Sequence, residues 1–301
     1  MSFAVLGPGG IGGLLAALLS RAGDDVVVLA RDSTARVIAE KGITVESPRF
    51  GTFTAHVGTA GRLEEPVDAC FVAVKSTHLA EALGRVPAAA LGRGLVIPLL
   101  NGLEHVELLR VVYPDESVVA GAIRIETDRP EAGLIRHASP FAAVDLAASD
   151  ANRDRVEMVA AHLKAAGLSV RVRDDEEAML WEKFVMLLPL ALLTTDERDN
   201  LGAIRTRRRS DLVAVVAEAA SVARAEGIAI DPDLVMRGLD SAPETLGSSM
   251  QRDQAAGRPL ELDSIGGALL RRASRAGVAV PVTARLVAGL EARAGGCRLG
   301  R

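Results

Sequence analysis

The chain has 301 residues, 49% hydrophobic and 25% charged, a composition typical of a globular protein with room for two domains. The net charge of -4 argues against a nucleic-acid partner, and the only basic run, 205–210, reads as a solvated helix start. Two cysteines, Cys70 and Cys297, are too few for a disulfide framework or a cysteine metal site, and no signal peptide is expected. We therefore expect a cytoplasmic protein with small-molecule partners, no membrane partner and no metal.

Strand and helix signals alternate through the first part of the chain. In order, the sequence predicts a strand at 3–7, a helix at 11–23, a strand at 25–31, a helix at 33–42, a hairpin-like pair within 43–57, a strand at 69–75, a helix at 77–86, a strand at 94–102, a helix at 103–113, a strand at 117–126, two β segments within 133–146, a helix at 152–166 and a strand at 168–174. Continuous apolar strands between amphipathic helices indicate a parallel sheet covered on both faces.

After Arg173 the strand signals stop and only helices are expected. They are the apolar run that follows Lys183, 210–227, a helix from 232 onward, 261–277 and a last helix opened by Pro281. The sequence therefore predicts an α/β domain over residues 1–173 and an all-helical substrate and catalytic domain over residues 174–301.

A glycine-rich loop follows the first strand and opens the first helix. Its glycines form a G-x-G-x-x-G pattern, in which Gly7 permits a tight turn, Gly9 lets the backbone approach a pyrophosphate and Gly12 allows close helix packing. This context predicts a Rossmann-type dinucleotide site, with a purely structural turn as the alternative. The expected cofactor-binding residues of the loop are Gly7, Pro8, Gly9, Gly10, Ile11 and Gly12.

Arg31 follows the second strand, where an NAD site usually carries an acid for the ribose hydroxyls. A guanidinium can instead hold the 2′-phosphate of NADP(H), which is the cofactor we expect. Two alternatives remain open: Asp32 would be the ribose acid if the register slipped by one residue, and Arg31 would otherwise be a surface-loop arginine.

Two polar residues lie near the carboxyl ends of predicted parallel strands, where open α/β sheets bind ligands. They are Lys75, in "VAVKSTHLAEAL", and Asn101, in "LLNGLEH". We expect both to contact the nicotinamide end of the cofactor and the substrate. The alternatives are a solvated lysine and an asparagine that caps a helix.

Lys183 precedes the uncharged run Phe184 to Leu193, which is too short for the roughly 20 residues of a membrane span and reads as a buried helix. Only four of the 35 lysines and arginines are lysines, so a lysine marks positions where arginine does not serve. Desolvating an ammonium is costly. Lys183 therefore needs either an exit to water, as a snorkelling lysine, or a use for its charge.

In "SSMQRDQAAGRPLELDSIGG", Ser249 lies near one helix end and Glu261 near the next helix start. Taken alone, Glu261 reads as a helix N-terminal acid. Together with the glycine loop, Arg31, "LWEKF" and the two strand-end motifs, this block resembles the ketopantoate reductase (2-dehydropantoate 2-reductase) family over nearly the whole chain. Its most recognisable part runs from "SSMQRD" through "ELDSIGGALLRRASRAGVAVPVT".

The resemblance implies a role for each polar residue. Lys183 would be the general acid, Glu261 a substrate-binding partner that supports it, and Ser249 a substrate contact. Asn101 and Lys75 would position the nicotinamide and the substrate. Chemistry supports the lysine independently, because hydride addition to a ketone leaves an alkoxide that an ammonium can stabilise and protonate, whereas arginine does not release its proton. We expect Lys183 at a dry cleft between the two halves.

Three positions depart from the family pattern. Leu187 and Ala191, four and eight residues after Lys183, and Leu246 stand where the family typically has asparagines that face the substrate. Pro189 also interrupts the helix and frees a backbone carbonyl. An apolar pocket cannot select a hydroxylated substrate as a hydrogen-bonding one does, which puts ketopantoate in doubt.

The function that we expect is NADPH-dependent reduction of a 2-oxo acid to a 2-hydroxy acid, with 2-dehydropantoate to pantoate in pantothenate biosynthesis as the first choice. A less polar keto substrate is the close alternative. A dehydrogenase of the 3-hydroxyacid or 6-phosphogluconate type and a catalytically idle NADP-binding protein remain as rivals, and a homodimer is left open.

Overall fold

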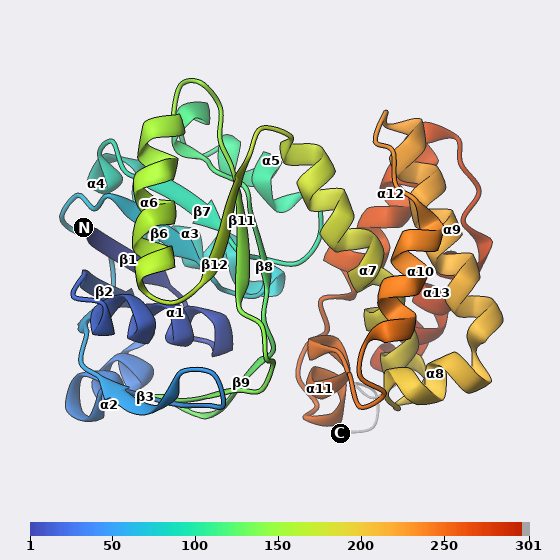
Figure 1. The fold of residues 1–301 in the computed structure, drawn as a ribbon, viewed down its shortest axis with the longest axis horizontal. Helices are drawn as coiled ribbons and strands as arrows, with labels where there is room; N and C mark the ends of the chain where they lie inside the picture. The colour runs from blue at the N-terminus through green and yellow to red at the C-terminus, as the bar shows by residue number, and fades with distance from the viewer. Residues whose placement is uncertain (297–301) are drawn as a thin grey trace. The chain divides into compact units, whose positions relative to one another are not determined.

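The structure, a computed structural model, describes residues 1–296 and divides into two compact units (Figure 1). Unit 1 comprises Met1–Leu100 and His105–Met179 and carries the strands found among residues 1–296. Unit 2 comprises Asn101–Glu104 and Leu180–Arg301, and the regular elements of its described residues are helices. The predicted α/β and all-helical organisation is confirmed. The chain changes unit inside a helix after Met179, beyond the boundary expected at residue 173, and Asn101 belongs with the helical unit.

Unit 1 is built on a parallel sheet of five strands in the order β5-β2-β1-β6-β7. The strands are β1 (Ser2–Leu6), β2 (Asp25–Leu29), β5 (Gly58–Ala60), β6 (Ala69–Val72) and β7 (Leu95–Pro98). Every residue of β6 and β7 is buried, as expected for continuous apolar strands covered on both faces. Because the strands are parallel, β1, β6 and β7 end at the same edge of the sheet, and the candidate cofactor residues follow them there.

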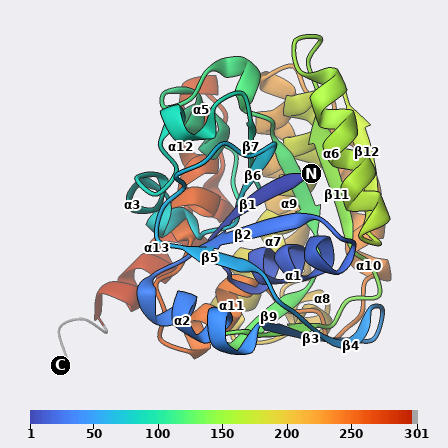
Figure 2. The same cartoon turned by 90° about the vertical axis from the view of Figure 1, so that its left-hand side faces the viewer.

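The helices of unit 1 differ in length and in how well the sequence predicts them. They are α1 (Gly10–Arg21), α2 (Asp32–Lys41), α3 (Leu79–Leu83), α4 (Ala88–Leu91), α5 (His105–Arg110) and α6 (Arg153–Ala165), with 3-10 turns η1 (Ser76–His78) and η2 (Asp115–Ser117). The helix expected at 77–86 is only η1 followed by the five residues of α3. In Figure 2 the side of unit 1 that carries β2, β5 and α1 faces the viewer.

The remaining strands form two mixed sheets, outside the parallel sheet that the sequence predicts. One has the order β4-β3-β10-β9 and the other β12-β11-β8. Their strands are β3 (Ile43–Ser47), β4 (Gly51–Ala55), β8 (Gly121–Arg124), β9 (Thr127–Glu131), β10 (Leu134–His137), β11 (Ala143–Ala147) and β12 (Ser169–Arg173). The hairpin-like pair predicted within 43–57 is confirmed, because β3 and β4 pair antiparallel. In the segment expected to be a parallel strand at 117–126, Val118 forms an isolated parallel bridge with Val96 of β7, but β8 itself pairs antiparallel with β11.

Unit 2 contains every helix from α7 onward. They are α7 (Glu176–Glu197), of which the residues from Leu180 on belong to this unit, α8 (Leu201–Arg207), α9 (Arg209–Ala225), α10 (Pro232–Ser241), α11 (Ser249–Ala255), η3 (Asp263–Gly267), α12 (Ala268–Ala276) and α13 (Pro281–Gly296). The stretch η3 has π-helical hydrogen bonding, a rare form that is frequently found at functional sites.

Helix α7 is longer than the uncharged run that the sequence draws attention to. Its 22 residues, with Pro189 inside, are long and apolar enough to cross a membrane by length and composition, so the helix is longer than the run Phe184 to Leu193 suggested. Within this protein, 67% of its apolar window is buried. Such burial is typical of a core helix, and no other helix among residues 1–296 passes the same test.

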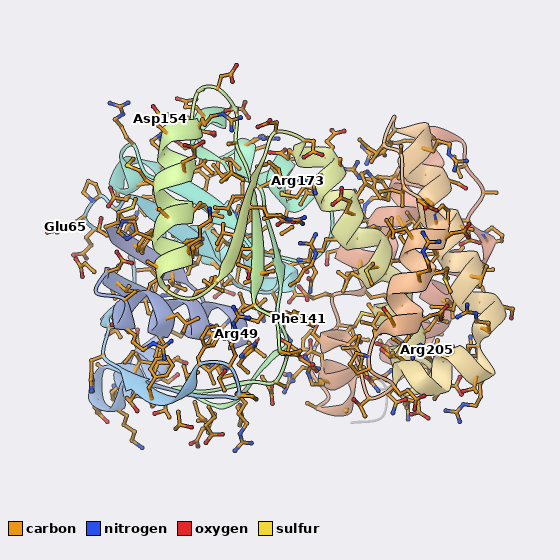
Figure 3. All side chains as sticks on the ribbon, in the orientation of Figure 1. Arg49, Glu65, Phe141, Asp154, Arg173 and Arg205 are labelled. Carbon is orange, nitrogen blue, oxygen red and sulfur yellow. The ribbon has the colours of Figure 1, made fainter. Side chains whose placement is uncertain are left out.

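The basic run at 205–210 spans the end of α8 and the start of α9 and is paired inside unit 2. Arg205 donates to the carbonyl oxygens of Leu239 and Ala242 at the end of α10 (Figure 3). Arg208 binds Asp196 at 2.9 Å and Asp211 at 2.8 Å. These guanidiniums hold helix ends together rather than forming a free cationic surface.

Candidate active site

Two of the three glycines that form the G-x-G-x-x-G pattern are required by the fold itself. Gly7 has φ +90°, a conformation that side chains other than glycine rarely adopt, and its amide donates to the carbonyl oxygen of Leu29 at 3.1 Å. A Cβ on Gly12 would lie 2.2 Å from the carbonyl oxygen of Gly7, closer than any real contact. The turn and the packing of α1 on β1 therefore both depend on glycine, as the motif predicts.

Gly9 is different, because nothing in the protein explains why it is a glycine. Its φ of -75° suits any residue, and a Cβ there would approach no atom of the described chain closer than the carbonyl oxygen of Ala73, at 3.9 Å. Gly9 is the N-cap of α1, and the first turn of that helix carries no acidic residue. Open space before a twelve-residue helix, whose first amides and dipole favour negative charge, fits a pyrophosphate.

The other predicted loop residues support this cradle. Pro8 is buried and Ile11 packs against the core of unit 1, while a Cβ on Gly10 would lie 2.6 Å from Oγ1 of Thr127 on β9. Gly10 is thus a packing glycine. The residues present fit a dinucleotide, with Gly9 as the position left open for it.

Arg31 is the N-cap of α2 and directs an exposed guanidinium from the end of β2. Its Nη2 lies 3.8 Å from Oε2 of Glu81, and the two side chains are 64% and 68% exposed, so this ion pair is weak and a phosphate can displace it. Asp32 is the first residue of α2 and is also exposed. A second cation, Arg85, went unnoticed in the sequence; its Nη1 donates to the carbonyl oxygens of Ala30, at 3.2 Å, and of Gly61, at 2.7 Å.

Lys75 follows β6 and is half-buried as the N-cap of η1. Its carbonyl oxygen accepts the amide of His78 at 2.9 Å, which fixes the backbone where the strand ends. Lys75 follows Ala73 and Val74, the residues that pack against Gly12 and Gly7. Lys75 therefore lies on the same strand-end segment as the glycine loop's packing partners, within unit 1.

The structure brings two predicted site residues into contact within unit 2. Nδ2 of Asn101 donates to Oε2 of Glu261 at 3.4 Å, although the two residues are 160 positions apart. Glu261 is only 6% exposed, and its backbone carbonyl accepts the amide of Ile265 at 3.1 Å. The backbone carbonyl of Glu261 therefore starts a helical stretch. Its carboxylate contacts the side-chain amide of Asn101, which follows β7 in the chain.

Lys183, Leu187 and Ala191 are spaced by four residues on α7 and so share one helix face. Lys183 and Leu187 are half-buried, whereas Ala191 is 1% exposed. Ala191 is therefore packed inside the fold, and of the two apolar residues after Lys183 only Leu187 keeps a partly open side chain. Pro189 has no amide hydrogen to give to the carbonyl of Val185.

The helix segment that carries Lys183 is anchored by Trp181, which the sequence reasoning passed over. Trp181 is 1% exposed, its Nε1 donates to Oε2 of Glu226 at 3.1 Å, and its ring meets that of Phe184 edge-on at 5.5 Å between centroids. Arg272 donates to the same Glu226 oxygen at 2.6 Å. The side chains of Trp181 and Phe184, on either side of Lys183 in the sequence, are thereby held in place. They set how this part of α7 is rotated about the helix axis.

Ser249 is the first residue of α11 and is half-buried, but the neighbouring Ser248 makes the structural contacts. Ser248 caps α11 in a capping box with Gln251, and its Oγ lies 2.9 Å from Oγ1 of Thr194 on α7. The sequence "SSMQ" carried this signal, because serine followed three residues later by glutamine is a helix-start pattern. Leu246, two residues earlier, is half-buried.

Among residues 1–296, no group of three or more histidine, cysteine or acidic side chains is placed to hold a metal ion. The polar residues predicted for the site in unit 2 are the ammonium of Lys183, the carboxylate of Glu261, the amide of Asn101 and the hydroxyl of Ser249, and of these Asn101 and Glu261 are in contact. Such a set suits proton transfer to and orientation of a small polar substrate.

Comparison with known proteins matches both parts of the chain to one family. Residues 3–150 match the model "Ketopantoate reductase PanE/ApbA", and residues 175–294 match "Ketopantoate reductase PanE/ApbA C terminal". The chain is 31% identical over 304 aligned positions to 2-dehydropantoate 2-reductase of Mycobacterium tuberculosis, covering 97% of this chain and 98% of that protein.

Solved structures share the fold over the full length. A 2-dehydropantoate 2-reductase from Geobacter metallireducens GS-15 matches with a TM-score of 0.88 and 28% identity, over 97% of this chain and 100% of that one. D-mandelate dehydrogenase with NADH and anilino(oxo)acetate matches with a TM-score of 0.91 and 22% identity, over 98% and 99% of the two chains. This second likeness shows the fold alone.

Proposed function

Since the chain belongs to the ketopantoate reductase family, we propose that it reduces 2-dehydropantoate to pantoate with NADPH, as a step of pantothenate biosynthesis. The family makes it an oxidoreductase that reduces a 2-oxo acid. The observation that carries the finer proposal is the contact of Asn101 with the buried carboxylate of Glu261, in the same unit as Lys183.

The chemistry needs one hydride and one proton. A bound nicotinamide supplies the hydride. After hydride reaches the carbonyl carbon, the oxygen is an alkoxide, and we assign its protonation to Lys183, whose ammonium first stabilises that negative charge. We assign substrate binding to Glu261, Asn101 and Ser249, and we keep Lys75 as a positioning residue for the nicotinamide and the substrate.

NADPH is proposed over NADH on the strength of Arg31. Its guanidinium is exposed at the end of β2 and held only by a 3.8 Å contact with Glu81. A bidentate contact to a phosphate is stronger than such a surface pair. The pyrophosphate is assigned to the open position at Gly9, where a Cβ would have no protein atom closer than 3.9 Å.

A less polar 2-oxo acid is the second candidate substrate. Leu187, one turn after Lys183, presents a half-buried apolar side chain where a hydroxyl group would need a polar partner. A substrate with a branched apolar end is therefore the alternative that Leu187 favours.

The deciding experiment is a panel of 2-oxo acids with NADPH, followed by loss of NADPH absorbance, on the wild-type enzyme and on Lys183→Ala. We expect turnover of ketopantoate, lowered by roughly 10²–10⁴ in the variant with NADPH binding intact, the usual share of one acid-base group. Lys183→Arg should lose nearly as much because it keeps the charge without a proton to release. Near-normal turnover in Lys183→Ala would remove the lysine from the mechanism.

Cytoplasmic location and a homodimer stay predictions for this chain. Light scattering of the purified protein, with and without NADPH, measures its mass in solution and decides the second of them. Cell fractionation decides the first.

A further inference from the structure

The contact between Asn101 and Glu261 depends on two short backbone segments that meet in unit 2. At 3.4 Å it is at the long end of hydrogen-bond distances, so it cannot fix either side chain by itself. Asn101 belongs to the four-residue segment Asn101–Glu104, which is joined to unit 1 on both sides. A segment this short needs other contacts to hold it against the helices.

Gly102 provides one of these contacts by its lack of a side chain. It has φ +101°, and a Cβ there would lie 2.3 Å from the carbonyl oxygen of Ser264. The backbone of the segment is thus pressed against η3 at a place where only glycine fits. This contact sets the distance between segment 101–104 and η3. Hydrogen bonds, which depend on direction, are needed to align the two segments.

Arg271, on α12, supplies that link to both segments at once. Its Nε and Nη2 donate to the carboxylate of Glu104, at 3.1 and 2.7 Å. Its Nη1 donates to Oδ1 of Asp263 at 2.7 Å, and Nη2 also donates to the backbone carbonyl of Asp263 at 3.1 Å. Glu104 is three residues after Asn101, and Asp263 is two residues after Glu261.

Room for this arrangement is made by Gly267, one turn before Arg271. A Cβ on Gly267 would lie 2.8 Å from Oδ1 of Asp263 and 3.1 Å from Nη1 of Arg271. The hydrogen bonds of Glu104, followed by those of Asp263, raise the pKa of Arg271 above its ordinary value, so the guanidinium stays charged at every working pH. Arg271 is 45% exposed, so its ion pairs contribute little to overall stability and act mainly through geometry.

We propose that Arg271 is a positioning residue of this enzyme: by bridging Glu104 and Asp263 it aligns the Asn101 amide with the Glu261 carboxylate. A planar guanidinium can hold two carboxylates in fixed directions, whereas a lysine ammonium at the same place acts as a point charge. The expected loss of activity rests on the proposed function. The alignment of Asn101 with Glu261 is a property of the fold and does not depend on that function.

The test compares Arg271→Ala and Arg271→Lys with Arg209→Ala as a matched control. Arg209 is also 45% exposed and also binds a carboxylate, Asp240, through both terminal nitrogens. We expect kcat/KM for the 2-oxo acid to fall by ~10–100-fold in both Arg271 variants, the scale of a small misplacement of catalytic groups, with NADPH affinity unchanged. The control should stay within about twofold of wild type, since surface changes away from special features are nearly neutral.

Two further measurements separate positioning from a general loss of structure. Hydrogen exchange of peptides covering residues 101–104 and 261–267 should become faster in the Arg271 variants and not in Arg209→Ala. The double variant Asn101→Ala, Arg271→Ala should have a kcat/KM within about threefold of that of Asn101→Ala alone. A residue that acts by positioning Asn101 has no further effect once the Asn101 side chain is removed.

Unchanged exchange in both segments, or losses that multiply fully in the double variant, would overturn the assignment. If wild-type enzyme reduced no 2-oxo acid in the panel, the proposed function would fail instead, and the exchange measurement would still decide whether Arg271 aligns the two segments.

Discussion

The hydroxyl oxygens of Thr194 and Ser248 lie 2.9 Å apart and share a hydrogen bond that ties the end of α7 to the N-cap of α11. Both side chains are buried, at 0% and 3% exposed. The contact joins the helix that carries Lys183 to the one that begins with Ser249. Ser248 therefore has a structural role, while a substrate contact stays the prediction for Ser249.

Ser248→Ala should therefore destabilise the protein by about 1–2 kcal/mol, since it removes a helix cap and leaves the hydroxyl of Thr194 without this partner. Urea unfolding measures the change. Ser249→Ala is the control, because no cap depends on it; its effect should be on KM for the substrate. Equal stabilities of the two variants would contradict the division of roles.

Gly9→Ala and Gly12→Ala should fail in different ways. A methyl group at Gly9 would enter open space, so thermal stability should stay near that of wild type while NADPH affinity falls at least about tenfold through the lost phosphate approach. A methyl group at Gly12 would lie 2.2 Å from the carbonyl oxygen of Gly7, so this variant should unfold at lower temperature even without cofactor. Calorimetry and cofactor titration on both proteins check the contrast; stable Gly9→Ala with full NADPH affinity would mean that the pyrophosphate lies elsewhere.

Arg31→Ala should weaken NADPH by about 1.5–3 kcal/mol, the range for a hydrogen bond to a charged group, and leave NADH nearly unchanged. Arg36→Ala, five residues later on α2, is a suitable control. Fluorescence titration with both cofactors gives the four dissociation constants. An NADPH affinity that does not respond to the loss of Arg31 would return it to the surface-loop alternative and leave Asp32 as the ribose ligand.

Asp145 on β11 should make stability depend on pH in the acid range. It is 1% exposed, and Arg171 and Arg124 hydrogen-bond to it at 2.6 and 2.7 Å. Burial alone would raise the pKa of Asp145, but the hydrogen bonds and charges of these arginines outweigh burial and lower it.

A lowered folded-state pKa means that the carboxylate stabilises the fold fully above its unfolded pKa of about 3.9, and that this contribution is lost as the pH falls through the folded value. Asp145→Asn should accordingly cost about 1–3 kcal/mol at pH 7, because both guanidiniums still reach water, and the cost should shrink below about pH 4. Urea unfolding of both proteins over this pH range measures the difference. A constant difference at every pH would show that the charge of Asp145 is not what matters.

The sequence predicted the helices and strands better than it predicted which strands pair with each other. Four of the five parallel strands, β1, β2, β6 and β7, and the helix α1 follow from continuous apolar runs and the glycine loop. The fifth strand, β5, was not predicted, because its three residues form no apolar run and none of them is fully buried. β8 and β9 pair antiparallel with β11 and β10, and the period of hydrophobic residues does not tell which strand lies beside which. At the site, the capping pattern of Ser248 was readable. The bridge made by Arg271 was not, because it depends on a π-helical turn and on a close backbone approach that no spacing in the sequence reports.

The apolar side chain of Leu187 gives the sharpest test of the substrate. It lies one turn after Lys183 on α7 and is half-buried, whereas Ala191, two turns after Lys183, is 1% exposed and packed inside the fold. A change at Leu187 should therefore alter substrate preference, while Ala191→Asn should bury an amide without a prepared partner and lower stability by about 1–3 kcal/mol. Substitutions at Leu187 and Ala191 therefore distinguish an effect on substrate preference from an effect on protein stability.

If Leu187 contacts the substrate, the wild-type enzyme should prefer a branched apolar 2-oxo acid such as 2-oxoisovalerate over ketopantoate. Each buried methylene adds ~1 kcal/mol to that preference, and a terminal hydroxyl without a partner loses ~1–3 kcal/mol. Leu187→Asn should then shift the ratio of kcat/KM toward ketopantoate by roughly tenfold or more, and Met186→Asn, on the exposed side of the same helix, should not. A wild-type enzyme that strongly prefers ketopantoate would show that other groups bind the hydroxyl, with Thr195, whose buried Oγ1 has no hydrogen-bond partner among the described residues, as the first to substitute.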